Sequence, residues 1–491
     1  VKKAIKRRGL TEAQSDMAKH IVRSKQIALV AGFAGSGKSY TLGAVREAYE
    51  KQGYRVLGVA PTGIAAEGLE SGSGIKSRTV ARLLWDVSEK QPYYYNSKFY
   101  MKGFSVDILK KKTPKIEKLS RKNILIVDEA GMIGTKNMQR LVDLAHNRRA
   151  KIVFVGSSQQ LQPIEAGGMF RALYERIGGI ELAEIWRQKK SWMKEATIML
   201  ERNNGKKAME AIDLYNEHKR IHEHADKETA FDAIAAAFRK NALSRMESWP
   251  KEKDSQLVIA YRNADVDELN QRIRKEARKI GKLEKTEYEF KTANGFRTFA
   301  VGDRIIFQKN DHRIGVRNGS LGTITKMHLG FAHIRFDVNL DNEQQITFKT
   351  STYNEFDLGY AATAHKTQGI TLADVIVYGD RFFDRHAALV SLSRHKENVS
   401  LHYDRETFKE GYPELRKTLG QDQSKMLATD VIDYREKDLE PIRPQRSHTQ
   451  LCAETTQLLS EMSKDRVQEG AALRERLQGE ATRLREKAQI E

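Results

Sequence analysis

A glycine-rich loop carries the clearest chemistry in the sequence. Residues 32–39 read GFAGSGKS and fit the pattern GxxxxGK[ST], between an apolar run at 27–33 and a helical stretch at 42–52. Glycines at such a turn allow backbone N–H groups to face phosphate oxygens at a helix N-terminus. Lys38 is expected to bridge the β- and γ-phosphates of ATP, and Ser39 to bind Mg²⁺. The residues expected to hold the nucleotide are Gly32, Gly35, Ser36, Gly37, Lys38 and Ser39. The alternative is an ordinary glycine turn.

Two adjacent carboxylates end another apolar run, LIVDEA at 125–130. Asp128 is expected to hold Mg²⁺ through water, and Glu129 to polarise the water that attacks the γ-phosphate. An acidic pair after a strand is also common as a solvated strand end. Because this pair and the loop at 32–39 fall on one expected sheet, they predict a nucleoside triphosphatase without saying which kind.

The elements that must position these residues follow an α/β pattern. Apolar runs of strand length lie at 27–33, 55–61, 123–130 and 151–157, with helical stretches such as 42–52 and 138–148 between them. Strands that alternate with helices predict βαβ units and a parallel sheet.

The second half of the chain repeats this pattern with an interruption. A charged helical stretch spans about 188–250, and the run QLVIAY at 256–261 restarts the α/β pattern. Short alternating strands with Gly and Asn turns at 299–336 predict a small β insert. The α/β pattern returns at 358, and the chain is charged and helical after about 410.

Further strings, in order and spacing over roughly residues 8–405, resemble the motifs of superfamily 1 helicases. They are LTEAQ (10–14, the Q motif), APTGIAA (60–66, motif Ia), SRTVARLL (77–84, motif Ib), GSSQQLQPIEAGGMFRAL (156–173, motif III), EIWRQ (184–188, motif IV), YAATAHKTQGITL (360–372, motif V) and LVSLSRHKENVSLHYD (389–404, motif VI). The resemblance is best to the 5′→3′ branch, superfamily 1B, and within it to the helicase half of TraA-type conjugative relaxases.

This resemblance implies an α/β fold with two RecA-like P-loop NTPase motor domains, a small SH3-like β insert and a helical C-terminal tail. It places the first motor domain at 1–187 and the second at 188–410, with the SH3-like insert at about 285–350. The charged helical tail is expected at 411–491.

The resemblance also implies roles for individual residues. Gln14 is expected to bind the adenine edge and Gln160 to sense the γ-phosphate. Arg187 and Arg394 are expected to reach ATP as arginine fingers; a surface salt bridge is the alternative for either one. The expected DNA contacts are Thr62, Thr79, Thr363 and His365, for each of which a helix cap or a satisfied core group is the alternative.

Two departures from the family pattern matter. Motif III normally reads Gly-Asp, whereas this chain has Gly156-Ser157, a change expected to weaken coupling or slow turnover. The catalytic tyrosine and three-histidine metal cluster of a relaxase would lie upstream of residue 1, so DNA nicking is not expected from this chain. The string HEH at 222–224 is interpreted as a solvated part of a charged helix.

The connection at 85–122 is longer than a simple crossover needs. It is rich in aromatic residues, including Tyr94, Tyr95 and Phe99, and carries lysines at 110–112. At this place the resembling helicases have a hairpin that parts the duplex, so we expect a strand-separating hairpin here. The alternative is that the rings only pack the insert against the first motor domain.

Composition is consistent with a nucleic-acid partner. The formal net charge is +20, which favours polyanions through counterion release. One cysteine, Cys452, excludes an internal disulfide framework, and no run is apolar enough for a membrane helix or a signal peptide. We therefore expect a cytoplasmic protein without membrane insertion; its opening on Val1 suggests a fragment of a longer chain or a non-standard start codon.

The function expected from the sequence is an ATP-dependent DNA helicase that moves 5′→3′ on single-stranded DNA and serves conjugative transfer or DNA processing. Its expected partners are single-stranded DNA, forked duplex DNA, and a relaxase domain or the conjugation machinery. One alternative is a DNA-stimulated ATPase that translocates without unwinding. Another is a non-catalytic DNA-binding remnant of a mobile element.

Overall fold

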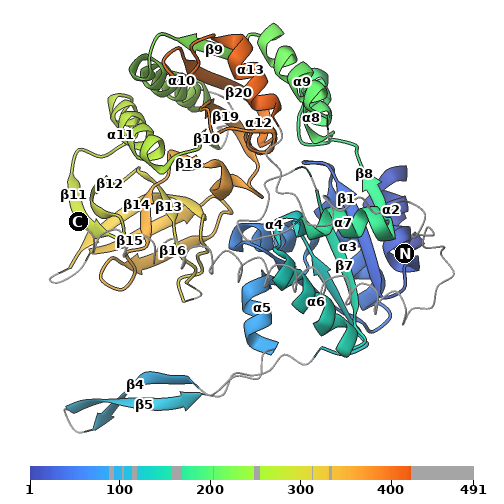
Figure 1. The fold of residues 1–491 in the computed structure, drawn as a ribbon. Helices are drawn as coiled ribbons and strands as arrows, with labels where there is room; N and C mark the ends of the chain where they lie inside the picture. The colour runs from blue at the N-terminus through green and yellow to red at the C-terminus, as the bar shows by residue number, and fades with distance from the viewer. Residues whose placement is uncertain are drawn as a thin grey trace, which may run out of the picture.

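Two parallel sheets, an antiparallel β insert and a separate β hairpin make up the described part of the molecule (Figure 1). The structure, a computed structural model, describes residues 1–87, 93–101, 104–112, 119–157, 159, 168–202, 204–247, 255–311, 313–330 and 334–421. For 93–101, 104–112 and 247 it describes the backbone alone. The expected α/β fold with two parallel sheets and a β insert is confirmed.

The first sheet contains both chemical motifs. Its strands, in spatial order, are β3 (Ser77–Thr79), β2 (Arg55–Ala60), β6 (Asn123–Val127), β7 (Lys151–Gly156), β1 (Ile27–Gly32) and β8 (Ile180–Leu182), all parallel. Its helices are α1 (Lys2–Arg8), α2 (Glu12–Arg23), α3 (Lys38–Glu50), α4 (Gly63–Ser73), α5 (Val80–Val87), α6 (Thr135–Asn147) and α7 (Met169–Ile177), with a short turn η1 (Ala130–Met132). Every residue of β6 and β7 is buried, as expected for strands covered by helices on both faces.

The second sheet follows after β8. Its strands are β18 (Ala361–Thr363), β10 (Gln256–Ala260), β19 (Leu372–Tyr378), β20 (His395–Asp404) and β9 (Ile221–His224), again all parallel. Its helices are α8 (Ser191–Glu201), α9 (Gly205–Glu217), α10 (Lys227–Glu247), α11 (Asn263–Lys279), α12 (Arg385–Leu392) and α13 (Tyr412–Gly420), with a short turn η2 (Ala364–Thr367). The helical interpretation of residues 222–224 is wrong, because they lie in the edge strand β9 and pair with β20.

The β insert lies between α11 and β18. It consists of a hairpin, β11 (Glu287–Thr292) and β12 (Gly295–Ala300), and an antiparallel sheet. In spatial order the strands of this sheet are β16 (Gln345–Lys349), β15 (Ile334–Leu340), β14 (Leu321–Leu329), β13 (Arg304–Phe307) and β17 (Phe356–Leu358). Buried phenylalanine rings fill it: Phe299, Phe307, Phe336, Phe348 and Phe356.

The aromatic connection in the first half forms a separate hairpin. β4 (Tyr93–Met101) pairs antiparallel with β5 (Phe104–Lys112), from Tyr93 opposite Lys112 to Met101 opposite Phe104. Figure 1 shows this hairpin standing apart from both parallel sheets. The side chains of Tyr94, Tyr95 and Phe99, on which the strand-separating hypothesis rests, lie outside the described part of the chain.

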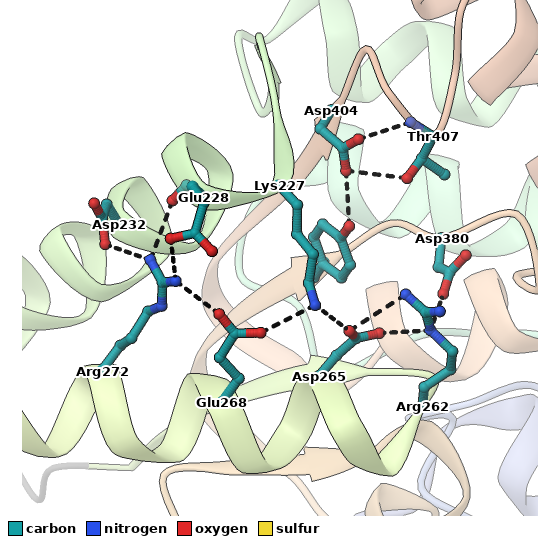
Figure 2. Close-up of polar contacts among 11 residues, drawn as sticks. Lys227, Glu228, Asp232, Arg262, Asp265, Glu268, Arg272, Asp380, Asp404 and Thr407 are labelled. Carbon is teal, nitrogen blue, oxygen red and sulfur yellow. Dashed lines mark hydrogen bonds and ion pairs between the residues drawn. The ribbon is translucent and has the colours of Figure 1, made fainter.

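Ion pairs tie the beginnings of α10 and α11 to the carboxyl end of β19 (Figure 2). Asp265, fully buried, accepts from Lys227 at 3.0 Å and from Arg262 at 2.9 Å. Arg262 also reaches Asp380 at 2.8 Å, and Lys227 reaches Glu268 at 3.0 Å. Each of the two buried carboxylates, Asp265 and Asp380, thus has an opposite charge beside it, close to the ends of β10 and β19.

We call the parts built on the first and the second parallel sheet the first and the second lobe. α13 packs on α9, so residues 412–420 still belong to the second lobe. Tyr412 and Arg416 donate to Asp213 at 2.7 and 2.6 Å. Residues 422–491 of the expected tail lie outside the described part. Over the described ranges, the structure contains no helix with the length and apolar character needed to cross a membrane.

Histidines join β9 to β20. The Nε2 atom of His224 lies 3.0 Å from Nδ1 of His402, and the ring of His222 packs against the same imidazole. One ring nitrogen must donate and the other accept, so at least the accepting ring is neutral, and the contact is lost when both rings are protonated. Burial, then the neighbouring histidines, lowers the pKa of His402 to about 3.

This pairing predicts acid destabilisation. The pKa of His402 is lower in the folded chain than in the unfolded one, so its contribution is present above pH 6.5 and is lost as the pH falls toward 3. The loss approaches about 1.4 kcal/mol per pH unit. We expect denaturant unfolding to show a shallower loss between pH 7 and pH 5 for His402→Asn than for the unaltered protein. An equal loss of stability in the two proteins would contradict the assignment to His402. It would point instead to His395, whose pKa burial also lowers to about 3 and which both proteins contain.

Candidate nucleotide site and nucleic-acid groove

The phosphate loop, residues 32–39, connects β1 to α3 at the carboxyl edge of the first sheet. Gly35 and Gly37 have φ values of 79° and 82°, the left-handed region that glycine adopts without strain. A Cβ atom on Gly35 would lie 2.5 Å from Cβ of Arg187, so a side chain is also excluded by packing. Lys38 begins α3 and donates through Nζ to the carbonyl oxygens of Gly32 and Phe33, at 2.7 and 2.9 Å.

Asp128 and Glu129 follow β6 at the same edge of the sheet. Asp128 is buried, and its Oδ1 accepts from the backbone N–H of Glu129 at 2.9 Å. Burial, then the charge of Glu129, raises the pKa of Asp128 to about 7, while the charge of Lys38 acts in the opposite direction. Glu129 has φ 50°, a strained conformation for a residue with a side chain. Such strain persists where surrounding structure imposes it and is concentrated at functional sites.

Both expected arginine fingers enter this charge cluster. Arg187 donates to the carbonyl oxygen of Ser393 at 2.7 Å, and burial, then the charge of Arg394, lowers its pKa to about 9. Arg394 is 1% exposed and donates through Nε to Val390 at 2.9 Å. The Nη2 atom of Arg394 is buried without a hydrogen-bond partner. Burial lowers the pKa of the Arg394 guanidinium, and the negative charges of Glu129 and Glu201 partly offset this effect. The salt-bridge alternative therefore does not describe Arg394.

These residues fit ATP and Mg²⁺ on their own geometry. Ser36 Oγ and Arg394 Nη2 are buried polar atoms without partners, which a phosphate could satisfy. Asp128 is a buried carboxylate next to a second one, Glu129, an arrangement that a divalent cation relieves. Ser39, at the start of α3, and Asp128 are the residues that would hold Mg²⁺.

Gln14 and Trp186 lie at the other side of the loop. Gln14 forms a capping box with Thr11, and a Cβ atom on Gly37 would lie 2.7 Å from its Nε2. Trp186 donates its backbone N–H to Gly35 at 2.9 Å, and its indole is 59% exposed. Sequence reasoning missed Trp186, although an aromatic residue directly before Arg187 was a signal. Gln160 lies outside the described part of the chain.

A groove of about 560 Å³ lies between the two lobes, on the side of the expected DNA contacts. Thr62, Thr79 and His365 line it, together with Asn310 and Gly319 of the β insert. Thr363 is buried at the end of β18 and does not line this groove.

Both lining threonines also cap helices, as the alternative interpretation held. Thr62 Oγ1 accepts from Ala65 N at 3.2 Å, and Thr79 Oγ1 accepts from Arg82 N at 3.2 Å. A capping hydroxyl can still present its other lone pair or its proton to a ligand, so the two roles are compatible.

The β insert closes one side of the groove against α4. Arg317, in the connection between β13 and β14, donates to the carbonyl oxygen of Gly63 at 2.9 Å and pairs with Glu70 at 3.6 Å. Asn342 donates to Glu67, also on α4. Segments from both lobes and the insert thus enclose the groove.

The role of Glu129 leads to a sharp expectation. We expect Glu129→Gln to lose ATP turnover while retaining ATP affinity, because Lys38 and Asp128 remain in place and only the proton acceptor is lost. Steady-state hydrolysis and fluorescent-nucleotide binding measure the two quantities. A variant with weakened binding and unchanged turnover would instead make Glu129 a binding group.

Fold and site together define a P-loop nucleotide-binding protein built on two parallel sheets. Residues 9–226 match the family model described as AAA domain. By fold, the chain is similar to Pif1 from Bacteroides bound to single-stranded DNA (TM-score 0.51, 20% identity, 80% of this chain and 92% of the other). It is also similar to Pif1 helicase from Candida albicans (TM-score 0.50, 18% identity, 80% and 94%).

Sequence comparison identifies more specific relatives within the class of P-loop nucleotide-binding proteins. The chain is 34% identical over 407 residues to the probable conjugal transfer protein TraA of Sinorhizobium fredii, and 36% identical over 405 residues to the conjugal transfer protein TraA of Rhizobium radiobacter. Each match covers 81% of this chain and 33% of the relative, so the chain spans about a third of the length of these proteins. It is 26% identical to the RecD2 helicase of Deinococcus radiodurans over 74% of this chain and 44% of that protein. Over 81% of its length the chain is thus similar in sequence to TraA conjugal transfer proteins, which confirms the resemblance read from its motifs.

Proposed function

We propose that this chain is an ATP-dependent DNA helicase that translocates 5′→3′ on single-stranded DNA. The observation that carries the proposal is Arg394, a buried guanidinium from the second lobe with an unpartnered Nη2, whose charge interacts with Glu129 in the first. An ATPase whose site is divided between two lobes can convert hydrolysis into relative movement of those lobes. A groove lined by both lobes then places a strand where that movement acts on it.

Each residue of the site has a role in hydrolysis. Lys38 turns from the loop carbonyls to the β- and γ-phosphates, and the loop N–H groups hold the remaining oxygens. Glu129 accepts a proton from the attacking water. Arg187 and Arg394 stabilise the charge that develops on the transferred phosphoryl group. Mg²⁺, when bound by Ser39 and Asp128, supplies charge neutralisation at the β- and γ-phosphates.

The adenine base is recognised in this proposal by Trp186 and Gln14, which lie next to Gly35 and Gly37 of the phosphate loop. The exposed indole of Trp186 offers a face on which the adenine ring can stack. Gln14 can bind the adenine edge with an amide that has both donor and acceptor atoms. Gln160 remains the proposed γ-phosphate sensor.

The DNA contacts in this proposal are Thr62, Thr79, Thr363 and His365, through phosphates for the most part. Hydroxyl and imidazole groups bind phosphate oxygens without reading sequence, which suits a protein that moves along a strand. Thr363 contributes from behind the groove only if β18 shifts, because it is buried.

We infer further that residues 1–187 and 188–410 are the two motor domains, that the β insert is SH3-like, and that the β4–β5 hairpin separates the strands. The relatives are named conjugal transfer proteins, which supports a role in conjugative DNA transfer beside a relaxase domain in the cytoplasm.

Two measurements test the proposal and its alternatives. ATP turnover with and without single-stranded DNA separates an enzyme from a non-catalytic DNA-binding remnant. Displacement of a strand from forked duplexes with a 5′ or a 3′ tail separates a helicase from a translocase that does not unwind. We expect DNA-stimulated turnover and displacement with the 5′ tail; stimulated turnover without displacement would favour the translocase.

A further inference from the structure

A buried carboxylate from the second lobe binds the phosphate loop directly. Glu201 is the last residue of α8 and is 2% exposed. Its Oε1 accepts from the backbone N–H of Ala34, within the loop, at 2.6 Å. Its Oε2 accepts from Ser157 Oγ, directly after β7, at 2.8 Å. One side chain thus binds the first lobe at two points.

Ala34 and Ser157, which Glu201 binds, both lie in segments that position the candidate nucleotide site. A Cβ atom on Gly131 would lie 2.3 Å from the carbonyl oxygen of Ser157, so the end of β7 is packed backbone to backbone against the turn that follows Glu129. Displacing Ser157 therefore displaces that turn, because no side chain lies between them to absorb the movement. Displacing Ala34 moves a loop that must hold phosphate oxygens.

The charges around Glu201 also belong to the nucleotide site. Burial raises the pKa of the Glu201 carboxyl, and Lys38, the two hydrogen bonds and Arg394 oppose that rise. Residue 157 is a serine, whose hydroxyl can donate to the carboxylate that comes from α8. Aspartate at 157 would place two carboxylates against each other in a buried place.

We propose that Glu201 is the positioning residue that couples movement of the second lobe, and hence DNA binding in the groove, to the phosphate loop. When α8 moves relative to the first sheet, its end must carry Ala34 and Ser157 along or break both hydrogen bonds. This inference rests on the proposed ATPase function. Loss of that function would appear as an inactive unaltered protein, whereas failure of the inference appears only in the variants below.

Three variants separate coupling from catalysis, with DNA-stimulated and DNA-independent turnover measured for each. Glu201→Ala removes both hydrogen bonds, and we expect stimulation by single-stranded DNA to fall about tenfold or more, with DNA-independent turnover changed less. Glu201→Gln keeps both contacts, since its amide oxygen accepts from Ala34 and its amide nitrogen donates to Ser157. We expect it to retain stimulation within about threefold of the unaltered protein. Glu195→Ala, an exposed position on the same helix, is the matched control.

A charge relocation tests the contact with Ser157. Ser157→Asp alone is expected to lose DNA stimulation, and Ser157→Asp combined with Glu201→Gln is expected to recover most of it, because one carboxylate and both contacts are restored. The affinity for single-stranded DNA in the absence of nucleotide should stay unchanged throughout, since the groove residues are untouched. Normal stimulation in Glu201→Ala, or equal loss of DNA-independent turnover in Glu201→Ala and Glu201→Gln, would overturn the proposal. Thermal unfolding checks that each variant is folded. If Glu201→Ala does not fold, the test rests on the comparison of Ser157→Asp with the double variant Ser157→Asp and Glu201→Gln.

Discussion

Replacing Lys38 with alanine is expected to abolish ATP hydrolysis while leaving the fold intact. Lys38 donates to two loop carbonyls, and its ammonium is the only side-chain cation of residues 32–39. Removing it takes away a charge that stabilises the β- and γ-phosphates in the transition state. We expect turnover to fall by at least about 10²–10³-fold, as when one preorganised donor is lost from an active site.

The control is Lys51→Ala, at the exposed end of the same helix. Lys51 lies after the last turn of α3, so its loss leaves the phosphate loop unchanged. Steady-state hydrolysis with saturating single-stranded DNA, with circular dichroism to verify folding, measures the effect. Turnover near that of the unaltered protein in Lys38→Ala would remove the nucleotide site from residues 32–39.

Arg394→Ala should lower turnover by about 10³-fold or more and change ATP affinity much less. The guanidinium is buried, with Nη2 free of protein partners, so its unused donor is available to a phosphoryl oxygen. An interaction that strengthens as charge develops in the transition state acts on kcat rather than on KM.

Two further variants sharpen this test. Arg394→Lys keeps a charge but loses the planar fork, so we expect only partial recovery. Lys396→Ala, an exposed neighbour on β20, is the control and should behave as the unaltered protein. A variant Arg394→Ala that raises KM and keeps kcat would demote Arg394 to a ground-state binding group.

The sequence alone determined the parts of the site that local chemistry dictates. A tight turn that opens a helix over phosphate needs glycine at Gly35 and Gly37, and the structure gives both residues positive φ values. Apolar runs long enough for buried strands placed the phosphate loop and Asp128 at strand ends, because parallel strands covered on both faces are apolar throughout. The alternation of these runs with helices predicted a parallel sheet in the first half of the chain and the return of an α/β pattern in the second.

The pattern of polar and apolar residues within one segment did not predict the structure where pairing with a distant strand decided it. Residues 222–224 are polar enough to suit a charged helix, yet they complete the second sheet, because β20 offers an edge with which they pair. The partner strand lies far along the chain: His224 bonds to His402, 178 positions away. A pattern within one segment contains no information about such a partner.

Only the tertiary structure decided which distant groups meet around the phosphate loop. Glu201 lies 167 positions from Ala34, and Arg187 lies 206 positions from Ser393. Glu201 has no motif of its own; it binds the loop because α8 ends where the two sheets face each other. Residue type and spacing specify what a loop can bind, since that depends on a few neighbouring atoms. Which carboxylate reaches the loop from the other lobe depends on how two separately built sheets pack, and that is a property of the whole chain.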